Sequence, residues 1–169
     1  MLEFIPVLGR NDIEQMVTDV AHRISSEYQN KELILIGILK GAFVFLSDLV
    51  RKLTIPFKID FVCVSSYGFN TLSSGNISLN KEIDIDINNK NILIIEDIVD
   101  TGSTLSYLVK YLKSFNPGTI KVCTLLDKYE CRKENVKIDY ACHVVSEGFF
   151  VGYGLIMPKI IGTYRIFTN

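Results

Sequence analysis

The chain has 169 residues, 48% of them hydrophobic and 22% charged, with a formal net charge of -1 at pH 7. These values indicate one globular domain, residues 1–169, that is long enough to bury a core. The near-neutral charge argues against nucleic acid as a partner, and no apolar run approaches the ~20 residues that span a bilayer, so we expect no membrane segment. Four scattered cysteines without a Cys-x-x-Cys pair argue against a zinc site and fit a reducing, cytoplasmic location.

The first half of the chain predicts helices and strands in alternation. A capping-box pattern begins at Asn11, and apolar residues then recur at helical spacing: Ile13, Val17, Val20 and Ile24. The apolar run 33–39 suits a strand that is covered on both faces, and a helix over 42–53 follows it. Residues 59–65 predict a second strand. The polar loop 66–78 is long for a compact domain, and long loops of this kind are often lids.

The second half continues the same alternation. Residues 91–95 predict another buried strand, and the helix after it carries one apolar stripe: Leu105, Leu108, Val109 and Leu112. Asn116-Pro117-Gly118 stops that helix, and residues 120–126 predict a further strand. Shorter strands are expected at 140–145 and 150–153. This alternation predicts an α/β fold with a mostly parallel sheet, whose ligands bind beyond the carboxyl ends of the strands.

The residues after the strand 91–95 combine an anion site with acidic groups. Glu96 and Asp97 come first, Asp100 follows, and Thr101-Gly102-Ser103-Thr104 then opens a helix. Hydroxyls and backbone N–H groups at a helix N-terminus cradle phosphate, and a glycine allows close backbone approach. Carboxylates would repel a phosphate unless they bind sugar hydroxyls or a magnesium ion. The string therefore suits a ribose 5-phosphate, with its phosphate in the cradle and its 2- and 3-hydroxyls on the acids.

This string, Ile92-Leu93-Ile94-Ile95-Glu96-Asp97-Ile98-Val99-Asp100-Thr101-Gly102-Ser103-Thr104, resembles the signature of the type I phosphoribosyltransferases. Four other stretches are similar to the hypoxanthine (6-oxopurine) branch: Gly37-Ile38-Leu39-Lys40-Gly41-Ala42, Ser65-Ser66-Tyr67-Gly68, Leu125-Leu126-Asp127-Lys128 and Phe149-Phe150-Val151-Gly152-Tyr153-Gly154. The match runs in order from about Ile5 to Leu155. It implies a mostly parallel central sheet flanked by helices, with a small hood formed by the terminal segments.

The resemblance also implies an activity and a role for each residue of the string. The enzyme would join hypoxanthine or guanine to 5-phosphoribosyl-1-pyrophosphate, giving IMP or GMP and pyrophosphate, and would be a homodimer or homotetramer. Asp100 would be the general base that accepts the purine proton. Glu96 and Asp97 would hold the ribose hydroxyls and Mg2+. The 5-phosphate would lie on Thr101, Gly102, Ser103 and Thr104.

Two basic positions are assigned to pyrophosphate by the same resemblance. Lys40 and Gly41 lie at a strand end where the family holds pyrophosphate, often through a non-proline cis peptide. Arg132 matches the family's second basic residue on the pyrophosphate side. From the residues alone, Lys40 could equally be a solvated lysine at a helix start.

The remaining assignments concern the purine and the lid. The ammonium group of Lys128 only donates hydrogen bonds, so it suits a ring oxygen and not a 6-amino group, which predicts hypoxanthine or guanine over adenine. The resemblance implies that Phe149 stacks on the purine and that the backbone of Phe150 contacts the base edge. Ser66 and Tyr67 belong to the loop that, in the family, closes over the reacting centre and excludes water.

The sequence departs from the family after Leu155. The family continues with an aspartate and a polar stretch containing an arginine, whereas here Ile156 follows at once and residues 157–162 resume a strand. The missing aspartate would assist a second magnesium ion and the missing arginine the pyrophosphate, and Arg165 is the candidate substitute. A catalytically weakened or regulatory member of the fold is therefore the alternative. An orotate- or adenine-type enzyme lacks support from the context of Lys128.

Overall fold

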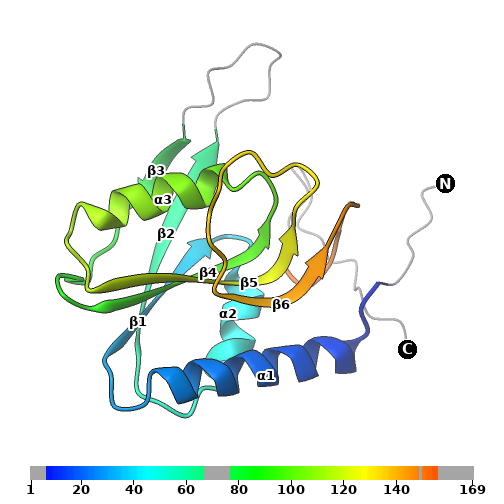
Figure 1. The fold of residues 1–169 in the computed structure, drawn as a ribbon, viewed down its shortest axis with the longest axis horizontal. Coiled ribbons are helices and arrows are strands. Elements are labelled where there is room, and N and C mark those ends of the chain that lie inside the picture. The colour runs from blue at the N-terminus through cyan, green and yellow to red at the C-terminus, as the bar shows by residue number, and fades with distance from the viewer. Residues whose placement is uncertain (1–6, 67–76, 149, 156–169) are drawn as a thin grey trace.

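The computed structural model describes residues 7–66, 77–148 and 150–155, and these residues form a six-stranded sheet with helices on both faces (Figure 1). The strand order is β3-β2-β1-β4-β5-β6. In chain order the elements are α1 (Arg10–Glu27), β1 (Leu33–Leu39), α2 (Phe43–Val50), β2 (Lys58–Ser66), β3 (Ile77–Lys81), β4 (Asn91–Val99), α3 (Ser103–Lys113), β5 (Thr119–Lys128) and β6 (Tyr140–Val145).

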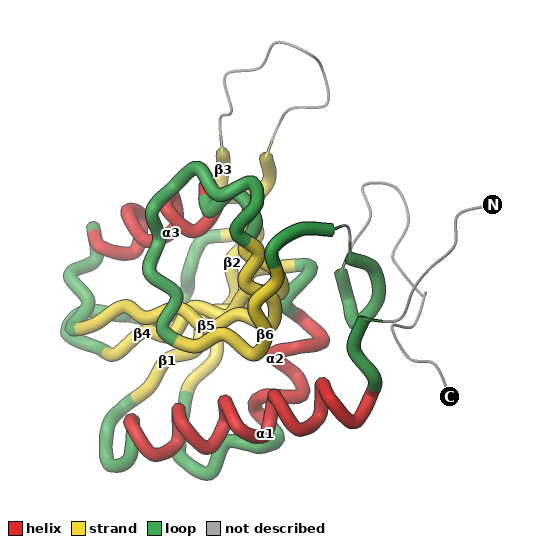
Figure 2. Tube along the Cα trace, turned by 45° about the vertical axis from the view of Figure 1, so that its right-hand side comes forward, coloured by secondary structure: helices red, strands yellow, loops and turns green. Residues whose placement is uncertain are grey.

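The sheet is parallel except at one edge, which confirms the predicted α/β class. Strands β2, β1, β4, β5 and β6 run parallel, and β3 pairs antiparallel with β2. Figure 2 shows α1 and α2 on one face of the sheet and α3 on the other. Each face has its own apolar core, one around Leu35 and Phe45 and the other around Ile36 and Leu108. Both faces of β1 and β4 are thus covered, which is why their sequences are continuous apolar runs.

Two predicted element boundaries are corrected by the structure. Helix α1 is capped at Gly9, whose N–H donates to Asp12 Oδ2 at 2.8 Å, so Asn11 lies inside the helix. The predicted apolar face of α1 is confirmed, with all four of its named side chains buried. Strand β4 does not end at Ile95 but continues to Val99, because β5 keeps pairing with it. The acidic pair therefore lies within the strand and not after it.

Two further expectations on irregular segments were wrong. The end of the loop expected at 66–78 belongs to the antiparallel edge strand β3, whose register with β2 shifts between Cys63 and Val64. The strand expected at 150–153 is instead a turn closed by an isolated bridge between Gly152 and Leu155. Three consecutive residues of that turn, Gly152, Tyr153 and Gly154, have positive φ angles, which a strand does not allow.

Asp60 on β2 fastens the connection between β3 and β4. Its carboxylate accepts hydrogen bonds from the backbone N–H groups of Phe61, Asp84 and Ile85 at 2.7, 2.6 and 3.1 Å, and from Lys81 Nζ at 3.2 Å. Burial alone would raise the pKa of Asp60, but these donors outweigh burial and hold the pKa below its ordinary value of 3.8. The connection is thereby tied to the sheet.

Among the described helices, none is both long and apolar enough to cross a membrane. The hood expected from the terminal segments falls mainly on residues 1–6 and 156–169, which lie outside the described ranges. The same is true of Ile156, Arg165 and the strand expected at 157–162.

Candidate active site

The ends of three neighbouring parallel strands bring the predicted site residues together. β1 lies between β2 and β4, and β4 lies between β1 and β5, so the strand order reverses direction between β1 and β4. Ligands of open parallel sheets bind in the crevice outside the carboxyl ends of the strands at such a switch point. Lys40 and Gly41 follow β1 directly, Asp100 follows β4, and Lys128 is the last residue of β5.

Gly41 and Asp97 meet across the switch point. A Cβ atom added at Gly41 would lie 2.0 Å from Asp97 Oδ2 and 2.6 Å from its Cγ, a separation that no side chain tolerates. The Leu39–Lys40 peptide bond before Gly41 is cis, as the family resemblance implies. The loop after β1 can therefore approach the β4 carboxylate only because position 41 is a glycine.

Glu96 and Asp97 form a buried carboxylate pair, with residue exposures of 7% and 8%. Glu96 Oε1 accepts the N–H of Asp97 at 3.1 Å, and Asp97 Oδ1 accepts the N–H of Ile98 at 2.8 Å. Burial and then the neighbouring charge of Asp97 raise the pKa of Glu96 well above its ordinary value. Magnesium is bound in proteins through one or two carboxylates together with water and phosphate oxygens, so this donor pair fits it. The described residues contain no cluster of three or more acidic, histidine or cysteine groups suited to a metal.

The segment between β4 and α3 has the geometry of a phosphate cradle. Gly102 caps α3 with φ 80°, a left-handed conformation that suits glycine. The first four N–H groups of an α-helix have no partner within the helix and attract anions. The Ser103 N–H donates a hydrogen bond to Thr101 Oγ1 at 3.3 Å, and Thr104 follows in the first turn of α3. The four predicted phosphate residues therefore form one continuous helix start.

Asp100 and Lys128 face each other where β4 and β5 end. The Asp100 side chain is 45% exposed, yet within the described part of the chain its Oδ1 atom is buried and has no hydrogen-bond partner. Lys128 Nζ lies 3.6 Å from that atom and 3.5 Å from Glu130 Oε2. Burial disfavours the ammonium charge, but Asp100, then Cys131 and Glu130, outweigh burial and raise the pKa of Lys128. A protonated lysine therefore stands beside an available carboxylate oxygen.

The guanidinium group of Arg132 contacts the main chain at the ends of β4 and β5 and one carboxylate, that of Asp127. Its Nε donates to the Asp100 carbonyl at 2.9 Å, and its Nη2 lies within hydrogen-bond distance of Val99 O, Asp127 Oδ1 and Lys128 O, at 3.1, 2.5 and 2.8 Å. These acceptors belong to the ends of β4 and β5. This role for one edge of the guanidinium was not expected from the sequence, and Asp127 was missed as its partner.

The turn at 150–155 docks beside the loop after β1. The Tyr153 hydroxyl donates to Asp48 Oδ2 on α2 at 2.5 Å, and a Cβ atom on Gly154 would lie 3.1 Å from the carbonyl oxygen of Gly41. The half-buried Phe150 packs against the core on the same face. No local pattern could have identified the pair of Tyr153 and Asp48, because 105 residues separate them.

Three of the predicted site residues lie wholly or partly outside the described part of the structure. Phe149 and Tyr67 lie outside the described residues. Ser66 ends β2, and only its backbone is described. The stacking and lid assignments therefore remain predictions.

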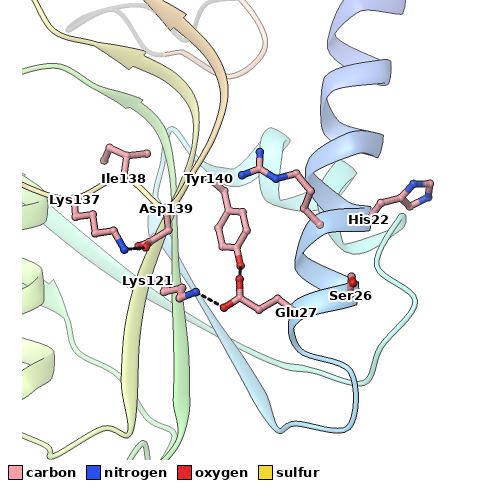
Figure 3. Close-up of a pocket in the computed structure, with 9 residues that line it drawn as sticks. His22, Ser26, Glu27, Lys121, Lys137, Ile138, Asp139 and Tyr140 are labelled. Atoms are coloured by element: carbon pink, nitrogen blue, oxygen red, sulfur yellow. Dashed lines mark hydrogen bonds and ion pairs between the residues drawn. The ribbon is translucent and has the colours of Figure 1, made fainter.

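An open depression of about 710 Å³ lies between α1 and the amino-terminal ends of β5 and β6 (Figure 3). Four of its charged groups are paired: Glu27 accepts from Lys121 and from the Tyr140 hydroxyl, and Lys137 pairs with Asp139 at 2.6 Å. It lies at the opposite end of the strands from Asp100 and Lys128. We therefore assign the chemistry to the carboxyl ends of the strands.

The parallel sheet thus brings together a carboxylate pair, a helix start and an aspartate–lysine pair at the carboxyl ends of its strands. This is the architecture of a type I phosphoribosyltransferase. Residues 9–156 match the phosphoribosyl transferase domain family, and the chain belongs to that family.

Curated relatives and solved structures extend this likeness over most of the chain. The chain is 42% identical over 151 residues to the hypoxanthine phosphoribosyltransferase of Buchnera aphidicola, with coverage of 88% of this chain and 85% of the relative. It is 41% identical over 149 residues to the hypoxanthine-guanine phosphoribosyltransferase of Bacillus subtilis, with coverage of 88% and 83%.

Among solved structures, a hypoxanthine-guanine phosphoribosyltransferase from Bacillus anthracis superposes with a TM-score of 0.88 at 32% identity, covering 99% of this chain and 97% of the other. A hypoxanthine phosphoribosyltransferase from Staphylococcus aureus superposes with a TM-score of 0.89 at 34% identity, covering 96% and 88%. The fold expected from the sequence is thus confirmed by proteins of known structure.

Proposed function

We propose that this protein is a purine-salvage transferase that joins hypoxanthine and guanine to 5-phosphoribosyl-1-pyrophosphate, giving IMP or GMP and pyrophosphate. The names and coverage of its relatives support this activity. The observation that carries it is the buried Asp100 Oδ1 atom, an acceptor available for a proton, with the ammonium group of Lys128 at 3.6 Å.

In the proposed reaction a ring nitrogen of the purine attacks C1 of the ribose, and the bond from C1 to the pyrophosphate oxygen breaks. Asp100 accepts the proton that this nitrogen loses, because among the described residues its buried Oδ1 atom has no hydrogen-bond partner and lies 3.6 Å from Lys128 Nζ. General-base assistance of this kind contributes ~10²–10⁴ in rate. Pyrophosphate leaves on the side of Lys40 and Gly41, beyond the end of β1.

The choice of purine follows from the donor chemistry of Lys128. An ammonium group donates to the 6-oxygen of hypoxanthine or guanine, whereas the 6-amino group of adenine offers only hydrogens toward it. The position of Lys128 next to Asp100 allows one purine to contact both residues at once. We therefore propose that 6-oxopurines are used and adenine is not.

Glu96 and Asp97 would hold the ribose hydroxyls and Mg2+, and Thr101 to Thr104 would hold the 5-phosphate. The adjacent, buried carboxylates and the glycine-capped helix start support these assignments. Bound magnesium would supply positive charge that offsets the charge developing on pyrophosphate.

We further propose that the protein is a homodimer or homotetramer located in the cytoplasm, where the four free cysteines stay reduced. Sedimentation would measure the size of the assembly.

The deciding assay incubates the protein with magnesium, 5-phosphoribosyl-1-pyrophosphate and one of four bases: hypoxanthine, guanine, xanthine or adenine. Nucleotide and pyrophosphate are quantified separately. We expect IMP and GMP to form and AMP to be absent. Product with adenine alone, or with none of the bases, would refute the proposal, and the second result would favour a regulatory member of the fold.

A further inference from the structure

The turn that follows β5 is fastened to the loop that follows β4 by more than one kind of contact. The backbone N–H groups of Lys133 and Glu134 both donate to the Thr101 carbonyl, at 2.9 and 3.0 Å. Ser106 Oγ on α3 lies 3.2 Å from Glu134 Oε2. A Cβ atom on Gly102 would meet Glu134 O at 3.0 Å, so the two segments are in close backbone contact.

Arg132 lies at the centre of this junction. Its four acceptors, at 2.5 to 3.1 Å, come from both sides: Val99 and Asp100 at the end of β4, and Asp127 and Lys128 at the end of β5. The guanidinium fork is rigid and offers donors in a fixed geometry, so four acceptors on two strands are held in one arrangement. The charge is balanced by the Asp127 carboxylate.

We propose that Arg132 is a positioning residue, which sets the distance between the backbone of the general base Asp100 and the backbone of the purine-contacting Lys128. The inference rests on the proposed function, because it assigns Arg132 to the purine side of the reaction. It differs from the expectation drawn from the sequence, which placed Arg132 on the pyrophosphate side. Two of its three carbonyl acceptors are those of Asp100 and Lys128 themselves, so Arg132 acts on both residues directly through their main chain.

Loss of the guanidinium would remove the side-chain link between the main chains of Asp100 and Lys128, while their own side chains and the β4–β5 pairing up to Val99 and Asp127 stay in place. A displacement of about 1 Å between reacting groups costs ~10²-fold in rate. Lysine should not replace arginine here, because its three donors sit on one nitrogen of a flexible chain and lack the fixed planar fork that bonds acceptors on both strands. We therefore expect Arg132→Lys to fall well short of the wild-type enzyme.

The test compares Arg132→Gln, Arg132→Lys and the matched control Lys133→Gln. The control removes one positive charge from the neighbouring position, where the side chain is exposed. Initial rates are measured with hypoxanthine and the sugar pyrophosphate varied separately, and the reverse reaction is measured with IMP while pyrophosphate is varied. Hydrogen exchange of the peptide covering residues 97–104 reports the junction independently of activity.

We expect both Arg132 variants to lose kcat by ~10²-fold and to raise the KM for hypoxanthine, with the KM for pyrophosphate near its wild-type value. Exchange at 97–104 should accelerate in these variants and not in Lys133→Gln. A raised KM for pyrophosphate with kcat and hypoxanthine KM retained would overturn the inference and make Arg132 a pyrophosphate ligand. Kinetics and exchange like those of Lys133→Gln would overturn it as well.

Failure of the proposed function gives a different result. A wild-type protein that forms no nucleotide from any 6-oxopurine refutes the proposed activity, whereas active wild type with unperturbed Arg132 variants refutes only the positioning role. If Arg132→Gln does not fold, the test uses Arg132→Lys, which keeps the positive charge. The same comparison applies: a loss of kcat and a raised KM for hypoxanthine support the positioning role, and a raised KM for pyrophosphate alone contradicts it. In an inactive wild type, hydrogen exchange still decides whether Arg132 joins the two strand ends.

Discussion

The replacement Gly41→Ala is expected to impair the enzyme through Asp97, without removing any functional group. The added Cβ atom would lie 2.0 Å from Asp97 Oδ2, and contacts below 3.0 Å essentially never occur. Either the loop after β1 or the carboxylate of Asp97 must therefore move by about 1 Å. Both belong to the proposed site for the sugar pyrophosphate, so a displacement of this size should lower kcat/KM for that substrate by ~10²-fold.

The measurement is steady-state nucleotide formation with the sugar pyrophosphate varied at saturating hypoxanthine. A matched control is Gly9→Ala at the start of α1, because among the described residues its added Cβ atom would meet only the side chain of Asp12, at 3.1 Å. Thermal unfolding of both variants separates a folding defect from a site defect. If Gly41→Ala is folded and as active as Gly9→Ala, the contact between Gly41 and Asp97 does not constrain the site and our reasoning is wrong.

Four further changes test other parts of the molecule. Asp100→Asn should keep binding of the sugar pyrophosphate, measured by calorimetry, and lose ~10²–10⁴ in turnover, because the proposed general base is removed. Lys128→Met should lower kcat/KM for hypoxanthine roughly 10- to 100-fold, as expected for a lost charged hydrogen bond, with sugar-pyrophosphate affinity unchanged. Asp60→Asn should lower the free energy of unfolding in urea at pH 7 by ~1–3 kcal/mol. Because the folded pKa of Asp60 is depressed, its stabilisation is present above pH 3.8 and is lost as pH falls through the folded pKa, so the difference from wild type should narrow there. Isoleucine stands at position 156, where the family has an aspartate, so wild-type turnover should keep rising at magnesium concentrations that saturate a typical relative. The replacement Ile156→Asp should recover part of the lost magnesium affinity. Saturation of the wild-type enzyme at low magnesium would refute this reasoning.

Much of the fold was predictable because its signals are local. The uninterrupted apolar runs of β1 and β4 predicted strands covered on both faces, and helical spacing predicted the buried stripes of α1 and α3. These patterns follow from the geometry of each element and need no partner to be recognised. The elements without such a pattern were missed or misplaced. The edge strand β3 exists through its pairing with β2, and β4 continues to Val99 because β5 pairs with it.

The site divides in the same way. The order of acids, glycine and hydroxyls from Glu96 to Thr104 is contiguous in the chain, so the sequence alone determined that carboxylates and a glycine-capped helix start lie side by side. Only the tertiary structure decided which distant residues they meet. Gly41 reaches Asp97, and Lys128 reaches Asp100, because parallel strands end at one edge of the sheet. Such contacts depend on strand order, and strand order is set by packing over the whole sheet, which no short segment encodes.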